Sequence, residues 1–312
     1  MTGRTALAFS GQGSQRPGMG DPWQHSGSWA VVEQVGRAAG RDVAELLLDA
    51  DKETLARTDN AQLATFALEM VMLAELGARG LPAVAACAGH SLGEYSALVA
   101  AGVVSVDDAA ELVAARGTAM LAASEARPGT MGVVVRGGPD EVGELTDRLR
   151  EQGAEVWVAN LNGPGQVVVS GTADGVAAVE REAPTIGGRL IRIPVGGAFH
   201  SPLMAPAVEP LSTAFGRVTL RPATVPVVAN VDGEPHGADA DWAALAARQV
   251  VSPVLWERSV RTLTTELGCE RIVEIGPGQT LTGLVRRIVP EVEMVPVSTP
   301  EALAELLAEW NG

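Results

Sequence analysis

The sequence predicts a protein of the α/β class in which a large domain with a mostly parallel sheet carries a smaller inserted domain. Strand-like apolar runs alternate with helix-like amphipathic stretches along most of the chain. One strand joins a helix through a glycine-rich turn at residues 89–93. Between residues 129 and 195 the order changes to strand, helix, strand, strand, helix, strand. We therefore expect residues 1–128 and 196–312 to form the large domain and residues 129–195 a ferredoxin-like small domain.

Composition and charge narrow the range of functions. The chain of 312 residues is 46% hydrophobic and 20% charged, which is ordinary for a globular enzyme. Its formal net charge of −15 argues against nucleic acid or an anionic membrane as the main partner. Cys87 and Cys269 show no metal or disulfide spacing, and no apolar run approaches the length of a signal peptide or membrane span. We expect a cytoplasmic monomer.

The N-terminal part begins with a buried strand over residues 5–10, which runs into a glycine-rich loop over residues 11–20. This loop has Arg16 where a dinucleotide-binding turn requires glycine and lacks the Lys-Ser/Thr ending of a phosphate-binding loop, so a nucleotide site is not favoured. Because the loop follows a strand, it can still bring Gln12 and backbone N–H groups to a ligand at the edge of the sheet. Apolar residues at helical spacing then predict a packed helix over residues 59–79.

The most informative stretch is Gly89–Gly93, which reads Gly-His-Ser-Leu-Gly. Small apolar residues over 83–88 predict a strand before it, and helix formers over 94–101 predict a helix after it. A serine on such a turn is exposed at the carboxyl end of an α/β-hydrolase-like sheet, and the helix N-terminus offers N–H groups to an oxyanion. We interpret Ser91 as a nucleophile. A glycine turn that serves only close packing is the structural alternative.

The next helix begins at a capping-box-like Ser105 and carries Arg116 on its apolar face. Leu112 and Met120 lie one turn before and after this arginine, and no carboxylate lies within helical reach. A buried guanidinium needs a partner. The partner is either an acidic side chain from elsewhere in the fold or the carboxylate of a ligand, which could bind in bidentate geometry.

The inserted segment and the C-terminal part follow the same patterns. A small domain beside the edge of a sheet forms a natural wall for a cleft. We expect strands over residues 131–135, 156–159, 166–170, 189–194, 225–230 and 271–275, and helices over residues 140–152, 173–182, 241–249, 257–267, 281–289 and from 300 onward.

A histidine can supply the base that a serine nucleophile requires. His90 is adjacent to Ser91 in the chain, and we expect its ring to point away from the hydroxyl. His200 lies on a separate loop where the chain returns to the large domain, so it can approach the serine from the side. We therefore predict that His200 is the general base.

Several motifs together resemble those of malonyl-CoA:acyl carrier protein transacylases and of the acyltransferase domains of polyketide synthases. The resemblance covers nearly the whole chain. The motifs, in order, are Phe9–Gln15, Gly89–Tyr95, Arg116–Gly117, Asn162–Gln166, Gly197–Met204, Gln249–Trp256 and Glu274–Gly278.

This resemblance implies roles in catalysis for five residues. Ser91 is expected to take the acyl group from coenzyme A, and His200 to activate the serine and later the thiol of the acyl acceptor. The backbone carbonyl of Gln249 is expected to orient the histidine in place of a carboxylate. The backbone N–H groups of Gln12 and Leu92 are expected to stabilise the oxyanion.

The resemblance also implies a substrate pocket. Arg116 matches the arginine that holds the free carboxylate of malonate, and Gln62 matches a pocket glutamine. Phe199 precedes the histidine, where phenylalanine accompanies malonyl substrates and serine accompanies methylmalonyl substrates. A single methyl group discriminates by only ~1–3 kcal/mol. His90 and Met120 complete the candidate substrate-binding residues.

Three positions depart from the family pattern. Ser10 and Leu63 stand where proline is frequent, and Gly197 stands where malonyl-type polyketide domains commonly have histidine. These changes affect the expected pocket wall and leave the expected chemistry in place.

The function implied is ping-pong transfer of malonyl from coenzyme A to the phosphopantetheine thiol of an acyl carrier protein, through acyl-Ser91. The coenzyme A thioester is then a substrate, and we expect no bound cofactor and no metal. Because carrier proteins are typically acidic, exposed arginines should provide a docking patch. The candidates are Arg181, Arg189, Arg192, Arg286 and Arg287.

Other functions fit parts of the pattern. A specialised transacylase could move methylmalonyl, aminoacyl or starter groups between carriers in polyketide biosynthesis. A serine hydrolase shares the Gly-x-Ser-x-Gly turn. A carrier-binding scaffold could keep the fold with an inert pocket. The motifs leave fatty-acid and polyketide biosynthesis equally open.

Overall fold

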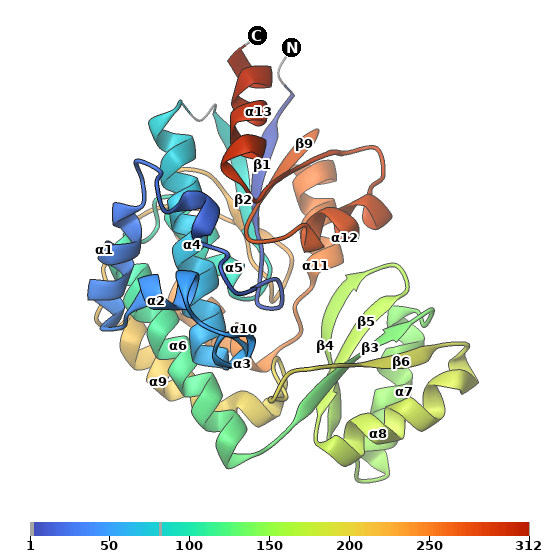
Figure 1. Cartoon of the computed structure of the whole chain (residues 1–312). Coiled ribbons are helices and arrows are strands. Elements are labelled where there is room, and N and C mark those ends of the chain that lie inside the picture. Colours follow the sequence, from blue (N-terminus) through green and yellow to red (C-terminus); the bar gives the residue numbers. More distant parts are fainter. Residues whose placement is uncertain (1–2, 81–82, 312) are drawn as a thin grey trace.

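Two β-sheets, one large and one small, organise the molecule (Figure 1). The computed structural model describes residues 3–80 and 83–311. Its strands are β1 (Thr5–Phe9), β2 (Val84–Gly89), β3 (Thr130–Val135), β4 (Val156–Gly163), β5 (Gln166–Gly171), β6 (Arg189–Ile193), β7 (Val227–Val228), β8 (Pro235–His236), β9 (Arg271–Ile275) and β10 (Glu293–Val297). The large sheet has the strand order β10-β9-β1-β2-β7-β8, and the small sheet has the order β4-β5-β3-β6.

The large sheet is parallel except where β7 pairs with β8. Along β1, Leu7 and Phe9 pack into one hydrophobic cluster, whereas Ala6 and Ala8 pack into another. This alternation follows from the two-residue period of a strand. Because both of its faces are covered, the strand is buried throughout, as is usual for parallel sheets. The predicted α/β class with a mostly parallel sheet is confirmed.

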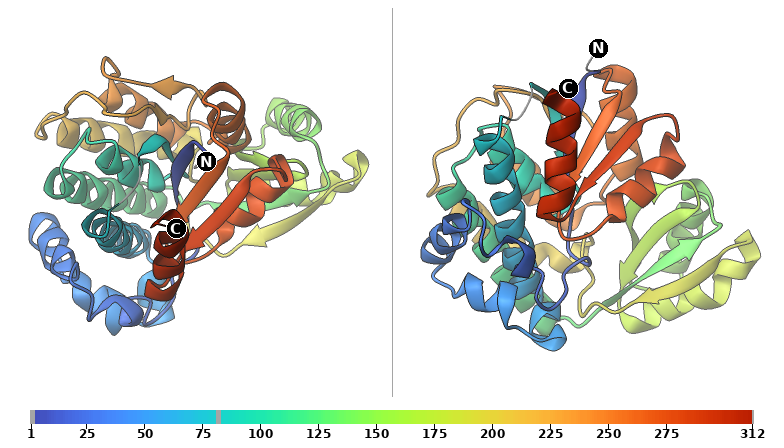
Figure 2. Two further views of the ribbon diagram at one scale, coloured as in Figure 1. Left: turned by 90° about the horizontal axis from the view of Figure 1, so that it is seen from above. Right: turned by 45° about the horizontal axis from the view of Figure 1, so that its top comes forward.

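Helices cover both faces of the large sheet (Figure 2). Residues of α4 and α6 share the cluster of Leu7 and Phe9, and residues of α11 and α12 share that of Ala6 and Ala8. The helices are α1 (Ala30–Ala39), α2 (Val43–Leu48), α3 (Lys52–Ala56), α4 (Thr58–Ala78), α5 (Gly93–Ala100), α6 (Val106–Ala126), α7 (Pro139–Glu151), α8 (Ala173–Glu182), α9 (Val208–Phe215), α10 (Trp242–Val251), α11 (Trp256–Arg261), α12 (Thr280–Ile288) and α13 (Pro300–Asn311).

Helix α4 is the central helix of the large domain. Its 21 residues are long and apolar enough to cross a membrane by length and composition alone, so the expectation that no run reaches this length is wrong here. However, 78% of its most apolar window is buried inside the protein. The helix is apolar because it lies in the core, with other elements packed around it.

The small sheet has the βαββαβ order predicted from the sequence. Its strands pair antiparallel, and α7 and α8 share a hydrophobic cluster with one face of the sheet. The opposite face supplies Met131, Val168 and Ile193 to the wall of a cavity. Strand β4 also bonds to the large domain, because the Leu161 N–H donates to the carbonyl of Val254 at 2.9 Å and the Val254 N–H donates to that of Ala159 at 2.9 Å. The small sheet is therefore fixed beside the segment that follows α10.

Several elements differ from the sequence prediction. The strand expected over residues 225–230 contains only Val227–Val228, because the chain turns after it: the Ala229 N–H donates to the carbonyl of Glu234, and the carbonyl of Asn230 accepts from Leu255. The helix expected over residues 257–267 is α11 followed by a π-helical turn, Thr262–Glu266. Helices α1 to α3 and α9 and strands β8 and β10 were not predicted; α2, α3, β8 and β10 are short, whereas α1 is a ten-residue amphipathic helix that the sequence prediction missed.

The glycines of the Gly89–Gly93 turn are required by close packing. A Cβ on Gly93 would lie 2.2 Å from the carbonyl oxygen of Phe9, and a Cβ on Gly89 would lie 1.9 Å from the carbonyl carbon of Gly93. The end of β1 therefore touches the turn, and no other residue fits at either position.

We expect Gly93→Ala to lower the free energy of unfolding by about 2 kcal/mol or more, because the backbone of β1 must move. Chemical denaturation monitored by circular dichroism measures this change. Gly283→Ala is the matched control, since a Cβ on Gly283 in α12 meets nothing within 4 Å. The control should gain about 0.5–1 kcal/mol. Equal stability of the two variants would contradict the packing argument.

Candidate active site

Ser91 lies at the turn between β2 and α5 with a φ of 53°. This left-handed conformation is unfavourable for a residue with a side chain, so the surroundings must hold it in place. Asn230 does so from the loop after β7. Its Oδ1 accepts a hydrogen bond from the Ser91 N–H at 2.7 Å, and its Nδ2 donates to the carbonyl of Gly89 at 2.7 Å.

His200 approaches Ser91 from the loop after β6. Its Nε2 lies 2.7 Å from Ser91 Oγ, and its Nδ1 lies 2.9 Å from the carbonyl oxygen of Gln249. A carbonyl can only accept, so Nδ1 carries the proton and Nε2 is free to accept the serine proton. His200 also has a left-handed backbone, with a φ of 57°.

Burial and charge keep His200 neutral. Burial lowers the pKa of the imidazole to about 3, and the nearby positive charge of Arg116 lowers it as well. The hydrogen bond to the Gln249 carbonyl acts in the opposite direction and is outweighed. A pKa below the ordinary 6.5 means that the ring stays unprotonated as the pH falls through the neutral range. The histidine is therefore available as a base.

Arg116 lies beside Ser91 and is only 1% exposed. Its Nη2 donates to Ser91 Oγ at 3.0 Å and to Oε1 of Gln249 at 2.9 Å, and its Nη1 donates to Oε1 of Gln62 at 2.6 Å. The guanidinium carbon also lies 5.5 Å from the centre of the Tyr95 ring. No carboxylate forms an ion pair with it in the part of the chain that the structure describes. The positive charge is thus buried with neutral partners only.

The side chain of Gln249 connects these groups. While its backbone carbonyl holds His200, its Nε2 donates to the carbonyl of Ser91 at 2.9 Å and to Oε1 of Glu94 at 2.9 Å. Burial raises the pKa of Glu94 to about 7. The hydrogen bonds from Asn230 and Gln249 and the charge of Arg116 lower this pKa, but burial outweighs them. The sequence motifs indicated the backbone of Gln249 and gave no role to its side chain.

A cavity of about 260 Å³ opens in front of Ser91, between the two sheets. The large domain contributes Gln12, Gln62, His90, Ser91, Leu92, Arg116, Met120, Phe199, His200 and Leu281, and the small domain contributes Met131, Asn160, Asn162, Val168 and Ile193. The structure therefore brings nine of the ten predicted site residues to the wall of one cavity, and the tenth, Gln249, lies directly behind it.

Gln12 and Leu92 line this cavity, and their backbone N–H groups are the candidates for an oxyanion site. Neither donates to another group among the described residues. Both are free to bind a ligand oxygen, which is what an oxyanion site requires.

His90 turns away from the serine hydroxyl, as expected from its place in the turn. Its Nε2 lies 2.8 Å from Oδ1 of Asn162, and its ring packs edge-on against Trp256 at a centroid distance of 5.5 Å. Asn162 belongs to the small sheet, so this contact ties the turn to the second domain. Burial lowers the pKa of His90 as well.

Two departures from the family pattern have a physical explanation. Ser10 Oγ donates to Oε1 of the buried Glu69 at 2.8 Å, and Glu69 also accepts from Ser96 at 2.6 Å. Serine thus replaces proline where it satisfies a buried carboxyl. At Gly197 a Cβ would lie 2.5 Å from the ring of Phe199. Glycine is therefore what allows the phenyl ring to occupy its place at the cavity.

Sequence reasoning missed Asn230, Asn162 and the role of Glu94. Asn230 ends a predicted strand and Asn162 begins a Gly-Pro-Gly-Gln turn, so both stood at the edges of recognised patterns. Glu94 directly follows the serine turn. Within residues 3–80 and 83–311, no group of His, Cys, Asp and Glu side chains is placed to hold a metal ion.

A serine hydroxyl bonded to a neutral histidine at the carboxyl end of a parallel sheet is the arrangement of serine-dependent acyl-transfer enzymes. Comparison with known proteins agrees with this class. The chain belongs to the acyl transferase family, whose domain model matches residues 7–304.

Relatives within this family are similar over nearly their full length. A malonyl CoA-acyl carrier protein transacylase of Bacillus subtilis is 37% identical, over 96% of this chain and 95% of that protein. The crystal structure of a malonyl-CoA:acyl carrier protein transacylase from Xanthomonas oryzae superposes with a TM-score of 0.94 at 34% identity, covering 99% of each chain. A malonyl-transacylase in complex with a type II polyketide synthase acyl-carrier protein gives a TM-score of 0.93 at 31% identity, over 98% of this chain and 99% of that one.

We expect the ring resonances of His200 to show no titration between pH 5 and pH 8, since its pKa is lowered to about 3 and the neutral form persists over that whole range. Histidine-selective NMR measures this directly, and a His200→Gln variant assigns the signal. A midpoint near the ordinary value of 6.5 would show that burial and the charge of Arg116 do not control this group.

Proposed function

We propose that the protein transfers a malonyl group from coenzyme A to the phosphopantetheine thiol of an acyl carrier protein through a malonyl-Ser91 intermediate. The observation that carries this proposal is the buried guanidinium of Arg116, 3.0 Å from Ser91 Oγ and without a carboxylate partner among the described residues. Such a charge is complementary to an acyl group that ends in a free carboxylate. The similar proteins named above act on malonyl groups and acyl carrier proteins.

In the first half-reaction, Ser91 Oγ attacks the thioester carbonyl while its proton passes to Nε2 of His200. The N–H groups of Gln12 and Leu92 stabilise the oxyanion of the tetrahedral intermediate. As the intermediate collapses, the bond to sulfur breaks and His200 returns the proton to the leaving coenzyme A thiolate. The products are malonyl-Ser91 and free coenzyme A.

In the second half-reaction, His200 takes the proton of the carrier thiol and the sulfur attacks the ester of malonyl-Ser91. The same two N–H groups stabilise the second oxyanion. Collapse releases Ser91, which regains its proton from His200. No bound cofactor takes part in this sequence, and coenzyme A and phosphopantetheine enter as parts of the substrates.

The malonyl carboxylate binds Arg116 in place of the contact to Ser91 Oγ. Two parallel N–H···O bonds fix its orientation, and Gln62 holds the opposite side of the guanidinium. Phe199, Met120 and His90 form the rest of the wall around the acyl group. Because Phe199 crowds the position of an α-substituent, malonyl fits better than methylmalonyl, by ~1–3 kcal/mol.

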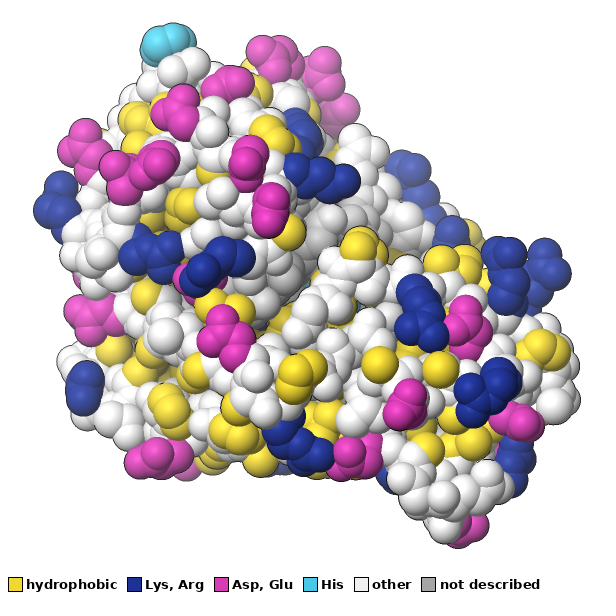
Figure 3. Space-filling view, turned by 60° about the horizontal axis from the view of Figure 1, so that its bottom comes forward, with side chains coloured by type: hydrophobic (Ala, Val, Ile, Leu, Met, Phe, Trp, Pro, Cys, Tyr) yellow, Lys and Arg dark blue, Asp and Glu magenta, His cyan; other side chains and the backbone are white. Residues whose placement is uncertain are grey.

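The carrier protein docks where the cavity opens. Residues of α12 and β6 line the cavity, and the same elements carry exposed Arg286, Arg287 and Arg189. Arg192 is paired with Glu180 at 2.7 Å and is therefore less available. Figure 3 shows basic side chains prominent on the small-domain lobe and acidic ones gathered over the large domain. This distribution suits an acidic partner in spite of the net charge of −15.

The proposal includes the organisation inferred from the sequence. Residues 129–195 act as a small domain that closes over the pocket, and the enzyme works as a cytoplasmic monomer. The strands of the small sheet, which run from Thr130 to Ile193, support these boundaries.

Incubation with malonyl-CoA should add a malonyl group to the wild-type protein, and Ser91→Ala should abolish this adduct. Intact-protein mass spectrometry measures it, and peptide mapping locates it. A malonyl adduct that persists in the variant would disprove the nucleophile. Release of free malonate without a carrier, at the rate of the full reaction, would instead indicate a hydrolase.

Arg116→Ala should reduce acylation by malonyl-CoA by about 100-fold or more, because two charge-assisted hydrogen bonds to the carboxylate are lost. Acylation by acetyl-CoA, which has no carboxylate, should change far less. Single-turnover rates for the two donors give the comparison. Equal losses for both would mean that the arginine has a structural role only.

Replacing both Arg286 and Arg287 by glutamate should raise the KM for the carrier protein about tenfold, since two attractive charges become repulsive. The rate of Ser91 acylation by malonyl-CoA should stay close to that of the wild type. Arg37→Glu on α1, which is also exposed, is the control. A similar rise in KM for the control would show a general charge effect and no local docking site.

A further inference from the structure

A buried polar cluster lies directly behind the site, and some of its side chains have no role in the proposed acyl transfer. Its centre is Glu94, which is only 2% exposed. The backbone N–H of Asn230 donates to Glu94 Oε2 at 2.6 Å, and Nε2 of Gln249 donates to Oε1 at 2.9 Å. Both oxygens of the carboxyl group therefore act as acceptors.

These contacts decide which way the carboxamide of Gln249 faces. One end of the amide meets Glu94, which accepts, and the other end meets Arg116, which can only donate. The NH₂ group must therefore face Glu94 and the oxygen must face Arg116. The opposite orientation would place two donors together at the guanidinium.

We infer that Glu94 is a positioning residue that selects for a carboxylated acyl group: it fixes the orientation of Gln249, which in turn holds Arg116 where the acyl carboxylate binds. This inference rests on the proposed function, because it concerns the same acyl pocket. We call the series Glu94, Gln249 and Arg116 the positioning chain.

The positioning chain also explains why Arg116 remains available. A carboxylate in direct contact with the guanidinium would neutralise it and occupy the edge that the substrate needs. Gln249 lies between Glu94 and Arg116. Glu94 therefore stabilises the positive charge of Arg116 without bonding to the guanidinium. The buried arginine is stabilised and still has no carboxylate partner among the described residues.

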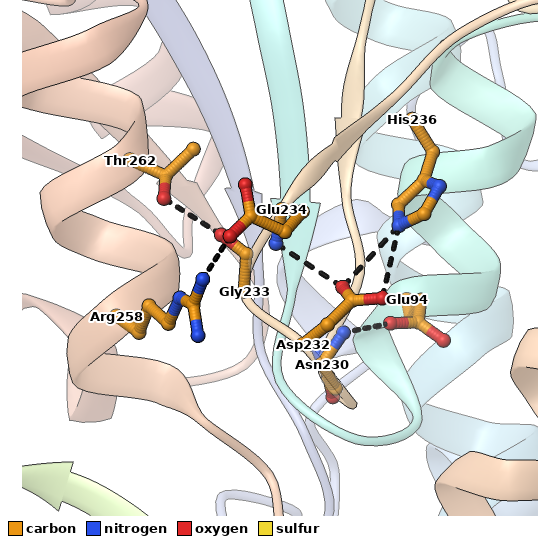
Figure 4. Close-up of polar contacts among 8 residues, drawn as sticks. All are labelled: Glu94, Asn230, Asp232, Gly233, Glu234, His236, Arg258 and Thr262. Atoms are coloured by element: carbon orange, nitrogen blue, oxygen red, sulfur yellow. Dashed lines mark hydrogen bonds and ion pairs between the residues drawn. The ribbon is translucent and has the colours of Figure 1, made fainter.

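The far end of the positioning chain is anchored by a well-connected loop (Figure 4). His236 bonds to Asp232, and the hydroxyl of Thr262 donates to the carbonyl of Gly233 at 2.6 Å. Glu234 pairs with Arg258 on α11. These contacts fix the backbone of Asn230. Its N–H group therefore keeps its position and needs an acceptor on the side chain of residue 94.

A glutamine at position 94 cannot satisfy both neighbours. Its single oxygen is required by the fixed N–H of Asn230, so its NH₂ group faces the NH₂ group of Gln249. If Gln249 keeps its orientation, two NH₂ groups meet at residue 94; if it turns over, its NH₂ group meets Arg116 and its oxygen meets the carbonyl of Ser91. In both cases Gln249 loses a hydrogen bond that holds it in place. The volume of the side chain is unchanged, so the variant tests hydrogen-bond direction and not packing.

The test is the ratio of Ser91 acylation rates with malonyl-CoA and acetyl-CoA, measured by intact-protein mass spectrometry. Glu94→Gln should lower this ratio about 10- to 100-fold, because Gln249 no longer holds its oxygen in a fixed position for Arg116. Inactivation by phenylmethylsulfonyl fluoride, an uncharged serine reagent, should change by about threefold at most, since the Ser91–His200 pair is kept. Glu75→Gln is the control, because Glu75 is also buried but lies near the end of α4, where it bonds to Ser28 and Arg79.

A double substitution separates this role from general loosening of the site. Gln249→Met should lower the ratio as much as Glu94→Gln, and adding Glu94→Gln to it should cause no further change, since Glu94 acts through Gln249. A further loss in the double variant, or equal slowing with both acyl donors, would overturn the inference. If Glu94→Gln does not fold, Gln249→Met alone provides the test, and an unchanged ratio overturns the inference.

Failure of the proposed function would look different. If wild-type protein formed no malonyl adduct on Ser91, the function itself would be wrong. If the wild type were malonylated normally and Glu94→Gln kept the wild-type ratio, only the inference about Glu94 would fail.

Discussion

The hydrogen bond between Ser91 Oγ and His200 Nε2 is the contact on which the rest of the structure converges. It joins two residues that are 109 positions apart, and both have left-handed backbones that strain the chain. The turn at Ser91 is held by glycine packing against β1 and by Asn230, and His200 is held by the carbonyl of Gln249. The two sheets and the loops between them thus serve to place two side chains 2.7 Å apart.

The second constraint is electrostatic. A guanidinium buried beside a nucleophile would ordinarily be paired with a carboxylate, but here it is held by two glutamine oxygens. The same charge lowers the pKa of His200 and keeps the base neutral. In the proposed function, the acyl carboxylate balances the charge of Arg116 and reduces its effect on the pKa of His200. The proposed base would then be stronger when the substrate is bound.

The local patterns in the sequence were sufficient to predict the small sheet, the inner strands of the large sheet and the serine turn, because strand, turn and helix are adjacent in the chain; the edge strands β8 and β10 were missed. They left the partner of Arg116 open, since spacing along one helix cannot say which distant group reaches it. Asn230 was missed for the same reason: it acts across 139 positions, at the end of a strand that proved much shorter than predicted. Family motifs indicated the backbone of Gln249, while the direction of its side chain depends on contacts to three separate elements.

Phe199, which we propose to take part in acyl selection, is held in place by its neighbours. The phenyl ring lies where a side chain at position 197 would otherwise be, since a Cβ there would approach it to 2.5 Å. The glycine at 197 and the place of the phenyl ring therefore depend on each other. Ser124 lies on another side of the same position, 2.4 Å from that Cβ, so a side chain at residue 197 would displace either the serine hydroxyl or the ring. In the proposed function, discrimination against branched acyl groups thus depends on the shape of the wall at Phe199, whereas recognition of the carboxylate depends on the charge of Arg116.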